Sequence, residues 1–174
     1  MRDWQPGRHL SVLLLLAGSV LLLDQVSKTW IVKVFTSSGR TSLPLAGDWL
    51  RFSLATNTGA AFGLLPQQTW LFVVAAVVVV PVIIYLGGTT AADPWPVRLS
   101  FGLMLGGSLG NLVDRIRLGH VVDFVDVGVG SLRWPSFNVA DSAFVVGTIL
   151  VVAYVLFWPQ TARPREVGDG APPA

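Results

Sequence analysis

Long apolar runs separated by polar stretches are the main pattern of the chain. Four runs, at about residues 10–30, 70–86, 97–113 and 141–158, approach the length of about 20 residues that a helix needs to cross a bilayer. Pro81 lies inside the second run, but membrane helices tolerate proline more readily than soluble helices do. Glycine recurs at every fourth position from Gly102 to Gly110, a spacing that lets helix backbones approach closely. The pattern therefore predicts four transmembrane helices in a single domain over residues 1–158.

The two longer polar stretches fall on the same side of this predicted membrane. In residues 35–69, an alternation of apolar and polar side chains over residues 50–54 predicts a short strand, and residues 57–59 resemble a turn. Residues 114–139 form the second stretch. Residues 159–174 hold four of the eleven prolines and few apolar residues, which predicts a disordered tail. The expected fold class is an all-α membrane protein with a small β-containing element between its first and second helices.

Composition excludes most soluble functions. The chain is 52% hydrophobic and 13% charged, with a mean hydropathy of +0.63, whereas soluble domains carry about 25% charged residues. A net charge of +2, from 12 basic and 10 acidic residues, is too small to indicate a nucleic-acid partner. The chain has no cysteine and only two histidines, His9 and His120, which leaves little material for a metal site. We therefore expect a small integral membrane protein without a cofactor.

Basic residues leave the orientation open. The side that holds both termini carries five Lys and Arg residues and the other side carries seven. The count alone would therefore place the two long polar stretches in the cytoplasm. Arg2 and Arg8 precede the first apolar run as in a secretory signal, but no small-residue cleavage site follows it cleanly, so we expect this helix to be retained.

Charged side chains in or beside the runs are candidates for function, because a charge within a membrane segment costs about 2.5–3.5 kcal/mol. Asp24 and Lys28 lie four residues apart on one face of the first helix, where a structural ion pair would also explain them. Asn111, Asp114 and Arg115 end the third helix. A buried pair between Asp114 and Arg115 that fixes this helix end is the simplest interpretation.

Two further aspartates flank the last polar stretch. Asp123 lies between apolar residues, and Asp126 would face the same way only if this segment were helical. Asn138 and Asp141 open the fourth helix with the spacing of a capping box, which by itself would account for Asp141. Because the third helix ends and the fourth begins on the same membrane face, the segment between them can bring Asp123 and Asp141 together.

Such a pair has the chemistry of a peptidase. Two carboxylates held close cannot both ionise easily, so one acts as a general base on water and the other as a general acid toward the leaving amine. No G-x-S-x-G or H-E-x-x-H motif is present. Ser27 and Lys28 are adjacent on a helix and point about 100° apart, which disfavours a Ser–Lys protease. A proton-coupled transporter that uses Asp24 and a non-enzymatic assembly factor are the alternatives.

Five motifs in a fixed order carry a resemblance to a known family. In chain order they are Asp24 to Lys28 (DQVSK), Asn57 to Gly63 (NTGAAFG), Gly106 to Arg115 (GGSLGNLVDR), Val121 to Phe124 (VVDF) and Phe137 to Asp141 (FNVAD). With them the chain resembles bacterial lipoprotein signal peptidase (signal peptidase II) over about residues 10–158. The resemblance implies an intramembrane aspartic endopeptidase that removes the signal peptide from diacylglyceryl-modified prolipoproteins, cleaving just before the lipidated lipobox cysteine.

The same resemblance implies roles for individual residues. Asp123 and Asp141 would be the catalytic pair. The substrate-binding or supporting residues would be Asp24, Lys28, Asn57, Gly59, Asn111, Asp114, Arg115 and Asn138. The implied partners are prolipoprotein substrates and membrane lipid, with no nucleic acid, no metal and action as a monomer. The implied location is the bacterial cell (inner) membrane, with cytoplasmic termini and a cytoplasmic tail at 159–174. The catalytic face and a β-containing cradle within residues 35–69 would then be extracytoplasmic.

Overall fold

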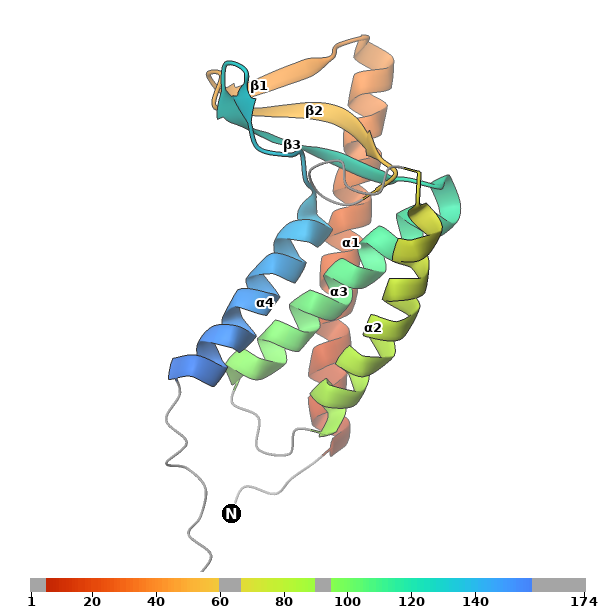
Figure 1. Cartoon of the computed structure of the whole chain (residues 1–174), viewed down its shortest axis with the longest axis vertical. Helices are drawn as coiled ribbons and strands as arrows, with labels where there is room; N and C mark the ends of the chain where they lie inside the picture. The colour runs from red at the N-terminus through yellow and green to blue at the C-terminus, as the bar shows by residue number, and fades with distance from the viewer. Residues whose placement is uncertain (1–5, 60–66, 90–94, 158–174) are drawn as a thin grey trace, which may run out of the picture.

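Four helices and a small sheet make up the part of the chain that the computed structural model describes, residues 6–59, 67–89 and 95–157. The helices are α1 (Pro6–Ser38), α2 (Thr69–Thr89), α3 (Trp95–Leu118) and α4 (Val139–Phe157). The sheet covers one end of the helix bundle, and α1 begins and α4 ends at the opposite end (Figure 1). The expected tail at 159–174 and the motif residues 60–63 lie outside the described residues.

Three of the described helices are long and apolar enough to cross a membrane: Leu10–Ser38 within α1, Thr69–Thr89 and Val139–Phe157. Apolar side chains on each of them, such as Leu15, Val78 and Ile149, are exposed, as a lipid-facing surface requires. α3 does not meet this criterion, although the sequence pattern predicted a span at 97–113. α3 lies against α1, α2 and α4, so its glycine-rich and less apolar sequence faces protein on several sides.

Glycines of α3 allow the neighbouring helices to approach, as their spacing predicted. A Cβ atom at Gly106 would lie only 2.6 Å from the Cβ of Val20 and 2.7 Å from the carbonyl oxygen of Ala17 on α1. At Gly107, on the side of α4, a Cβ would collide with the carbonyl oxygen of Ala140. The close approach of both helices to α3 brings their polar residues together near the sheet.

The sheet is antiparallel, with the strand order β1-β2-β3-β4. Its strands are β1 (Ser42–Ala46), β2 (Leu50–Asn57), β3 (Val121–Val129) and β4 (Leu132–Arg133). The strand predicted at residues 50–54 is confirmed within β2. β1 and β2 form the β element predicted between the first and second helices, but the sheet is larger than predicted, because β3 and β4 come from the segment between α3 and α4. The mostly apolar β3 is buried between β2 and the helix ends, where a strand needs no alternation of apolar and polar residues.

α1 extends well past residue 30, where the sequence pattern placed its end, because its last turns carry the sheet. Ile31 and Phe35 of α1 are buried in a cluster with Phe124 of β3, and Phe52 of β2 packs against it. The rings of Phe52 and Phe124 meet edge to face, with centroids 5.7 Å apart. This apolar contact fixes β3, and therefore Asp123, relative to α1.

Candidate active site

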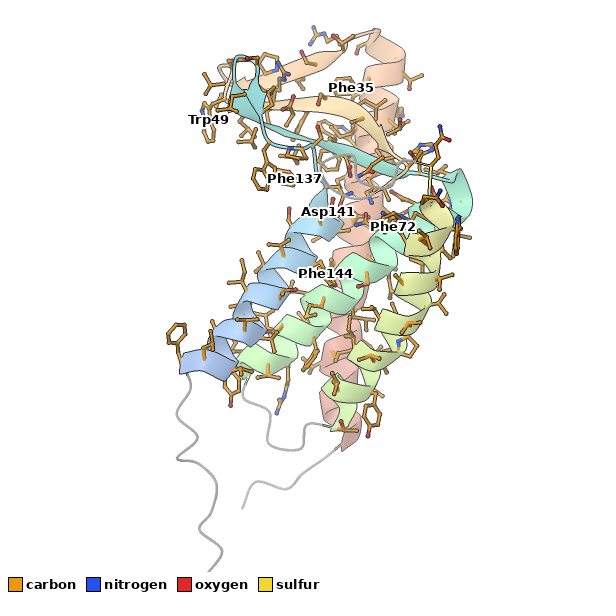
Figure 2. The ribbon with its side chains drawn as sticks, viewed as in Figure 1. Phe35, Trp49, Phe72, Phe137, Asp141 and Phe144 are labelled. Carbon is orange, nitrogen blue, oxygen red and sulfur yellow. The ribbon has the colours of Figure 1, made fainter. Side chains whose placement is uncertain are left out.

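The ten site residues expected from the sequence belong to one hydrogen-bonded network beneath the sheet, where α1, α3 and α4 end or pass below β3. Asp141 lies at the sheet end of α4, directly below the strands (Figure 2). The network contains Asp24, Lys28, Asn57, Gly59, Asn111, Asp114, Arg115, Asp123, Asn138 and Asp141. Residues from five separate segments of the chain therefore converge on one place.

Asp123 projects from β3 into this network and is 2% exposed. Its Oδ2 accepts a hydrogen bond from the side-chain amide of Asn57 at 3.0 Å, and its Oδ1 accepts one from the side-chain amide of Asn138 at 2.7 Å. Asn57 is itself held in a turn, because its Oδ1 accepts a hydrogen bond from the backbone N–H of Gly59 at 3.0 Å. Both oxygens of the Asp123 carboxyl are thus oriented by neutral amides.

Asp141 and Asn138 form the capping box that their spacing predicted. Asn138 Oδ1 accepts from the backbone N–H of Asp141 at 2.9 Å, and Asp141 Oδ2 accepts from the backbone N–H of Asn138 at 3.1 Å. The other oxygen of Asp141 accepts a hydrogen bond from the side-chain amide of Asn111 at 2.7 Å. Since Asn138 also donates to Asp123, this single residue contacts both carboxyl groups. Asp123 and Asp141 are therefore neighbours, as the sequence predicted.

A buried ion cluster lies behind the two aspartates. Lys28 Nζ is 2.8 Å from Asp24 Oδ2 and 2.8 Å from Asp114 Oδ2, and it donates a third bond to Asn111 Oδ1 at 3.1 Å. The pair between Asp24 and Lys28 on one face of α1 is thus confirmed. The expected pair between Asp114 and Arg115 was wrong, because adjacent residues of a helix point in different directions and Asp114 faces Lys28 on α1.

Arg115 instead connects the third helix to the turn after β2. Its guanidinium donates to the carbonyl oxygen of Asn111 at 3.4 Å and to that of Gly59 at 3.3 Å. It also lies over the ring of Phe72 on α2, 5.0 Å from the centroid, in a cation–π contact. These contacts place a positive charge at the edge of the network.

Asp126 lies outside this network, since a strand turns residues three apart to opposite faces. Its two oxygens accept hydrogen bonds from Arg51 and Arg133, each at 2.6 Å. Burial acts to raise the pKa of Asp126, but the hydrogen bonds and charges of the two arginines outweigh it and hold that pKa below its usual value. Asp126 is therefore an ion-pair partner within the sheet.

Gln25 belongs to the network although no role was expected for it. Its side-chain amide donates to Asp114 Oδ1 at 2.8 Å, to Asp24 Oδ2 at 3.2 Å and to the carbonyl oxygen of Gly110 at 3.3 Å. The only sequence signal was its place beside Asp24 in the first motif. A glutamine can stand next to a membrane acid for many reasons, so its position beside Asp24 does not identify Gln25 as a site residue.

Electrostatics at Asp123 favour a carboxyl group that keeps its proton to a higher pH than an ordinary aspartate does. Burial raises the pKa of Asp123 to about 6, and the neighbouring charge of Asp141 adds to the rise. Hydrogen bonds from Asn57 and Asn138, and the charge of Lys28, act in the opposite direction but do not cancel it. The site thus offers two adjacent carboxyl groups of which one can hold a proton, the arrangement needed for general acid and base catalysis. Among the described residues, no three His, Cys, Asp or Glu side chains are grouped as a metal site requires.

Comparisons with known proteins agree with this chemistry. A family profile described as Signal peptidase (SPase) II matches residues 16–157. The lipoprotein signal peptidase of Syntrophomonas wolfei is 42% identical over 137 residues, which cover 79% of this chain and 87% of that protein. The lipoprotein signal peptidase of Mycolicibacterium smegmatis is 41% identical over 178 aligned positions, which cover 98% of this chain and 72% of that protein.

A solved structure supports the same comparison at the level of the fold. It is described as a bacterial membrane enzyme and superposes on this chain with a TM-score of 0.76 at 27% sequence identity. The superposition covers 90% of this chain and 94% of that one. The bundle and sheet described above therefore form the fold of a known membrane enzyme.

Proposed function

The chain belongs to the signal peptidase II family, and on this premise we propose that it removes the signal peptide from diacylglyceryl-modified prolipoproteins, cutting just before the lipidated cysteine. We assign the catalysis to Asp123 and Asp141. The observation that carries this assignment is that Asn138 contacts both carboxyl groups and holds them side by side. The family supports the reaction, and the geometry supports the choice of these two among the acids of the chain.

In the proposed reaction the two carboxyl groups share one proton. The ionised carboxylate takes a proton from a water molecule as the water oxygen attacks the scissile carbonyl carbon. The protonated carboxyl then donates its proton to the leaving nitrogen, and the carbon–nitrogen bond breaks. The raised pKa of Asp123, about 6, supports Asp123 as the group that holds the shared proton.

The remaining network residues have supporting roles in this proposal. The amides of Asn57, Asn111 and Asn138 orient the two carboxyl groups. Arg115 fixes Gly59 and the turn after β2 beside the dyad.

We further propose that α3 is a fourth membrane span and that residues 1–158 form one domain that acts as a monomer. The contacts of α3 with α1, α2 and α4 support the fourth span, since they place α3 inside the bundle. The termini and the tail at 159–174 would be cytoplasmic and the sheet extracytoplasmic. The number of Lys and Arg residues on the sheet side argued against this orientation. Three of those seven residues (Lys28, Arg51 and Arg133) are ion-paired, which weakens that argument.

Contact with lipid is part of the proposal. The dyad lies where the helix bundle meets the sheet, so a bond at the surface of the bilayer could reach water while the acyl chains of the substrate stay in lipid. Exposed Trp30 and Trp70 near this level are typical of a membrane interface. The gathering of Asp24, Asp114, Asp123 and Asp141 at one end of the bundle also argues against a transporter, whose acids would line a path near the midplane.

The test is cleavage by the purified protein in liposomes of two forms of one prolipoprotein, with and without the diacylglyceryl group. We expect cleavage before the lipidated cysteine and little or none of the unlipidated form. Equal cleavage of both forms would contradict the proposed substrate class. No cleavage of either form by a correctly inserted protein would contradict the peptidase itself.

A further inference from the structure

The two buried acids of the ion cluster each bind the main chain immediately before one aspartate of the dyad. Asp24 Oδ1 accepts a hydrogen bond from the backbone N–H of Ala140 at 3.0 Å, and Ala140 precedes Asp141. Asp114 Oδ2 accepts one from the backbone N–H of Val122 at 3.2 Å, and Val122 precedes Asp123. One acid from α1 and one from α3 thus hold the backbone of α4 and of β3.

Lys28 joins these two acids. Its ammonium group has three protons and no acceptor, and it has one partner for each proton: Asp24 Oδ2, Asp114 Oδ2 and Asn111 Oδ1. Because Asn111 Oδ1 faces Lys28, the side-chain nitrogen of Asn111 points the other way and donates to Asp141 at 2.7 Å. Lys28 therefore acts on the dyad along three routes, two through the backbone and one through Asn111.

Burial makes this arrangement rigid. The exposed fractions are 0% for Asp24, 3% for Lys28 and 3% for Asp114. Gln25 donates to both carboxylates, and Gly110 admits Asp24, since a Cβ there would lie 2.6 Å from Asp24 Oδ2. A buried ion cluster of this kind is poor evidence for stability, because its desolvation cost rivals its Coulombic gain. The hydrogen bonds and close packing of this cluster, by contrast, leave its side chains few alternative arrangements.

We propose that Lys28, Asp24 and Asp114 form a clamp that sets the spacing between Asp123 and Asp141, with Lys28 as the central positioning residue. The proposal rests on the peptidase function proposed above. None of the three touches the reacting atoms in this proposal. They act by fixing the backbone of the residues before each aspartate and the orientation of Asn111.

If Lys28 acts through its geometry and not only through its charge, a substitution that keeps the positive charge should still lower turnover. Lys28→Arg keeps the positive charge but changes the length and shape of the group that joins the two acids. Since a displacement of about 1 Å in a catalytic constellation can cost about a hundredfold in rate, we expect Lys28→Arg to lower kcat by about that factor with KM unchanged. Lys33→Met is the matched control, because Lys33 is exposed on the same helix, and it should leave kcat and KM unchanged.

The pH profile supplies a readout that lost stability alone would not move. The separation between its acidic and basic limbs reflects the coupling of the two carboxyl groups, and hence their distance. The charged groups around the dyad are Asp24 and Lys28 from α1 and Asp114 and Arg115 from α3. All of these charges persist in Lys28→Arg, so a changed separation of the limbs would report altered spacing.

A second variant covers the case in which Lys28→Arg does not fold. Lys28→Met combined with Asp24→Asn and Asp114→Asn removes all three charges of the cluster, so that no buried carboxylate is left without a cation. Thermal unfolding in detergent should then show a folded protein, and hydrogen exchange should be faster at the amides of Val122 and Ala140. We expect kcat to stay about a hundredfold low, because the clamp is still broken.

Wild-type kcat with an unmoved pH profile in either folded variant would overturn the clamp. So would a loss of kcat that only matches the loss of folded protein. The peptidase function is tested separately, since the wild-type protein and the Lys33→Met control must cleave lipidated precursor in the same assay. If they do not, the proposed function fails whatever the Lys28 variants do.

Discussion

Asn138 and Asp141 are bonded to each other twice, in opposite directions. Each uses a side-chain oxygen to accept a hydrogen bond from the backbone N–H of the other, at 2.9 Å and 3.1 Å. The capping box engages Oδ2 of Asp141 and leaves Oδ1 to Asn111, so the cap itself determines how the carboxyl group is presented. Capping and catalysis are therefore not competing explanations of Asp141.

Substitution of Asn138 should separate these two roles. Asn138→Ala removes the cap, at about 1 kcal/mol, and the amide that orients Asp123, so both stability and kcat should fall. Asn138→Ser restores a good capping group but cannot reach Asp123 with a second donor. We expect the serine variant to unfold at a higher temperature than the alanine variant, while its kcat stays as low as that of the alanine variant. Equal recovery of both quantities would contradict a role for Asn138 in the dyad.

Asp123→Asn should abolish cleavage without weakening the fold. Loss of a general acid or base lowers the rate by about 10²–10⁴-fold. Because the pKa of Asp123 is raised to about 6, this group contributes stability below the unfolded pKa of about 4 and loses it as the pH rises through about 6. The asparagine variant loses this charge cost at pH 7 but sets its NH2 group against the donor amide of Asn57 or Asn138, so its unfolding temperature should stay close to that of wild type. A marked drop in its unfolding temperature would instead indicate a structural role.

The pH dependence of kcat/KM should follow the singly protonated dyad. Activity should decline toward alkaline pH as the shared proton is lost and toward acidic pH as the second carboxyl group is protonated, which gives a bell-shaped profile. The raised pKa of Asp123 places the start of the alkaline decline near pH 6 in the free enzyme. A profile that is flat from pH 5 to pH 9 would rule out the acid–base pair.

The sequence predicted which polar residues meet better than it predicted the architecture around them. Apolar runs located the helices, and the flanking loop placed Asp123 near Asp141. The pattern could not show that β3 joins the sheet, because a short apolar run reads equally as a strand or as a buried helix. It could not give the partner of Asp114 either, since Lys28 is distant in sequence and only the packing of α1 on α3 brings it close.

Asp126 should stabilise the sheet rather than support catalysis. Asp126 pairs with two partly exposed arginines, so removing its charge should cost about 1 kcal/mol or more, and Asp126→Asn should lower the unfolding temperature measurably at neutral pH. Because the pKa of Asp126 is held below its usual value, its contribution is present above about pH 4 and is lost as the pH falls through the folded pKa. The difference from wild type should therefore vanish in acid. Asp48→Asn is the comparison variant: Asp48 pairs with the same two arginines but its side chain is 54% exposed, so its substitution should lower the unfolding temperature less than Asp126→Asn does.

Gly106→Ala should disrupt the contact of α3 with α1. A Cβ at Gly106 would lie 2.7 Å from the backbone oxygen of Ala17, which cannot move aside as a flexible side chain could. Overpacking of this kind costs about 1–3 kcal/mol, so the unfolding temperature in detergent should fall. Gly18→Ala on α1 is the control, since its Cβ would meet nothing within 4 Å, and it should unfold like wild type.

The length of α1 determines how far the dyad lies from the end of the bundle where α1 begins. Eighteen residues separate Pro6 from Asp24 along this helix, about 27 Å at 1.5 Å per residue, and a further stretch of about 20 Å runs on to Ser38. Because α1 is one continuous helix, the dyad would be held at a fixed distance from the end of the bundle where α1 begins. The position of the cut would then depend on how far the substrate's own helix extends through the membrane. No residue of the active site would need to recognise that position.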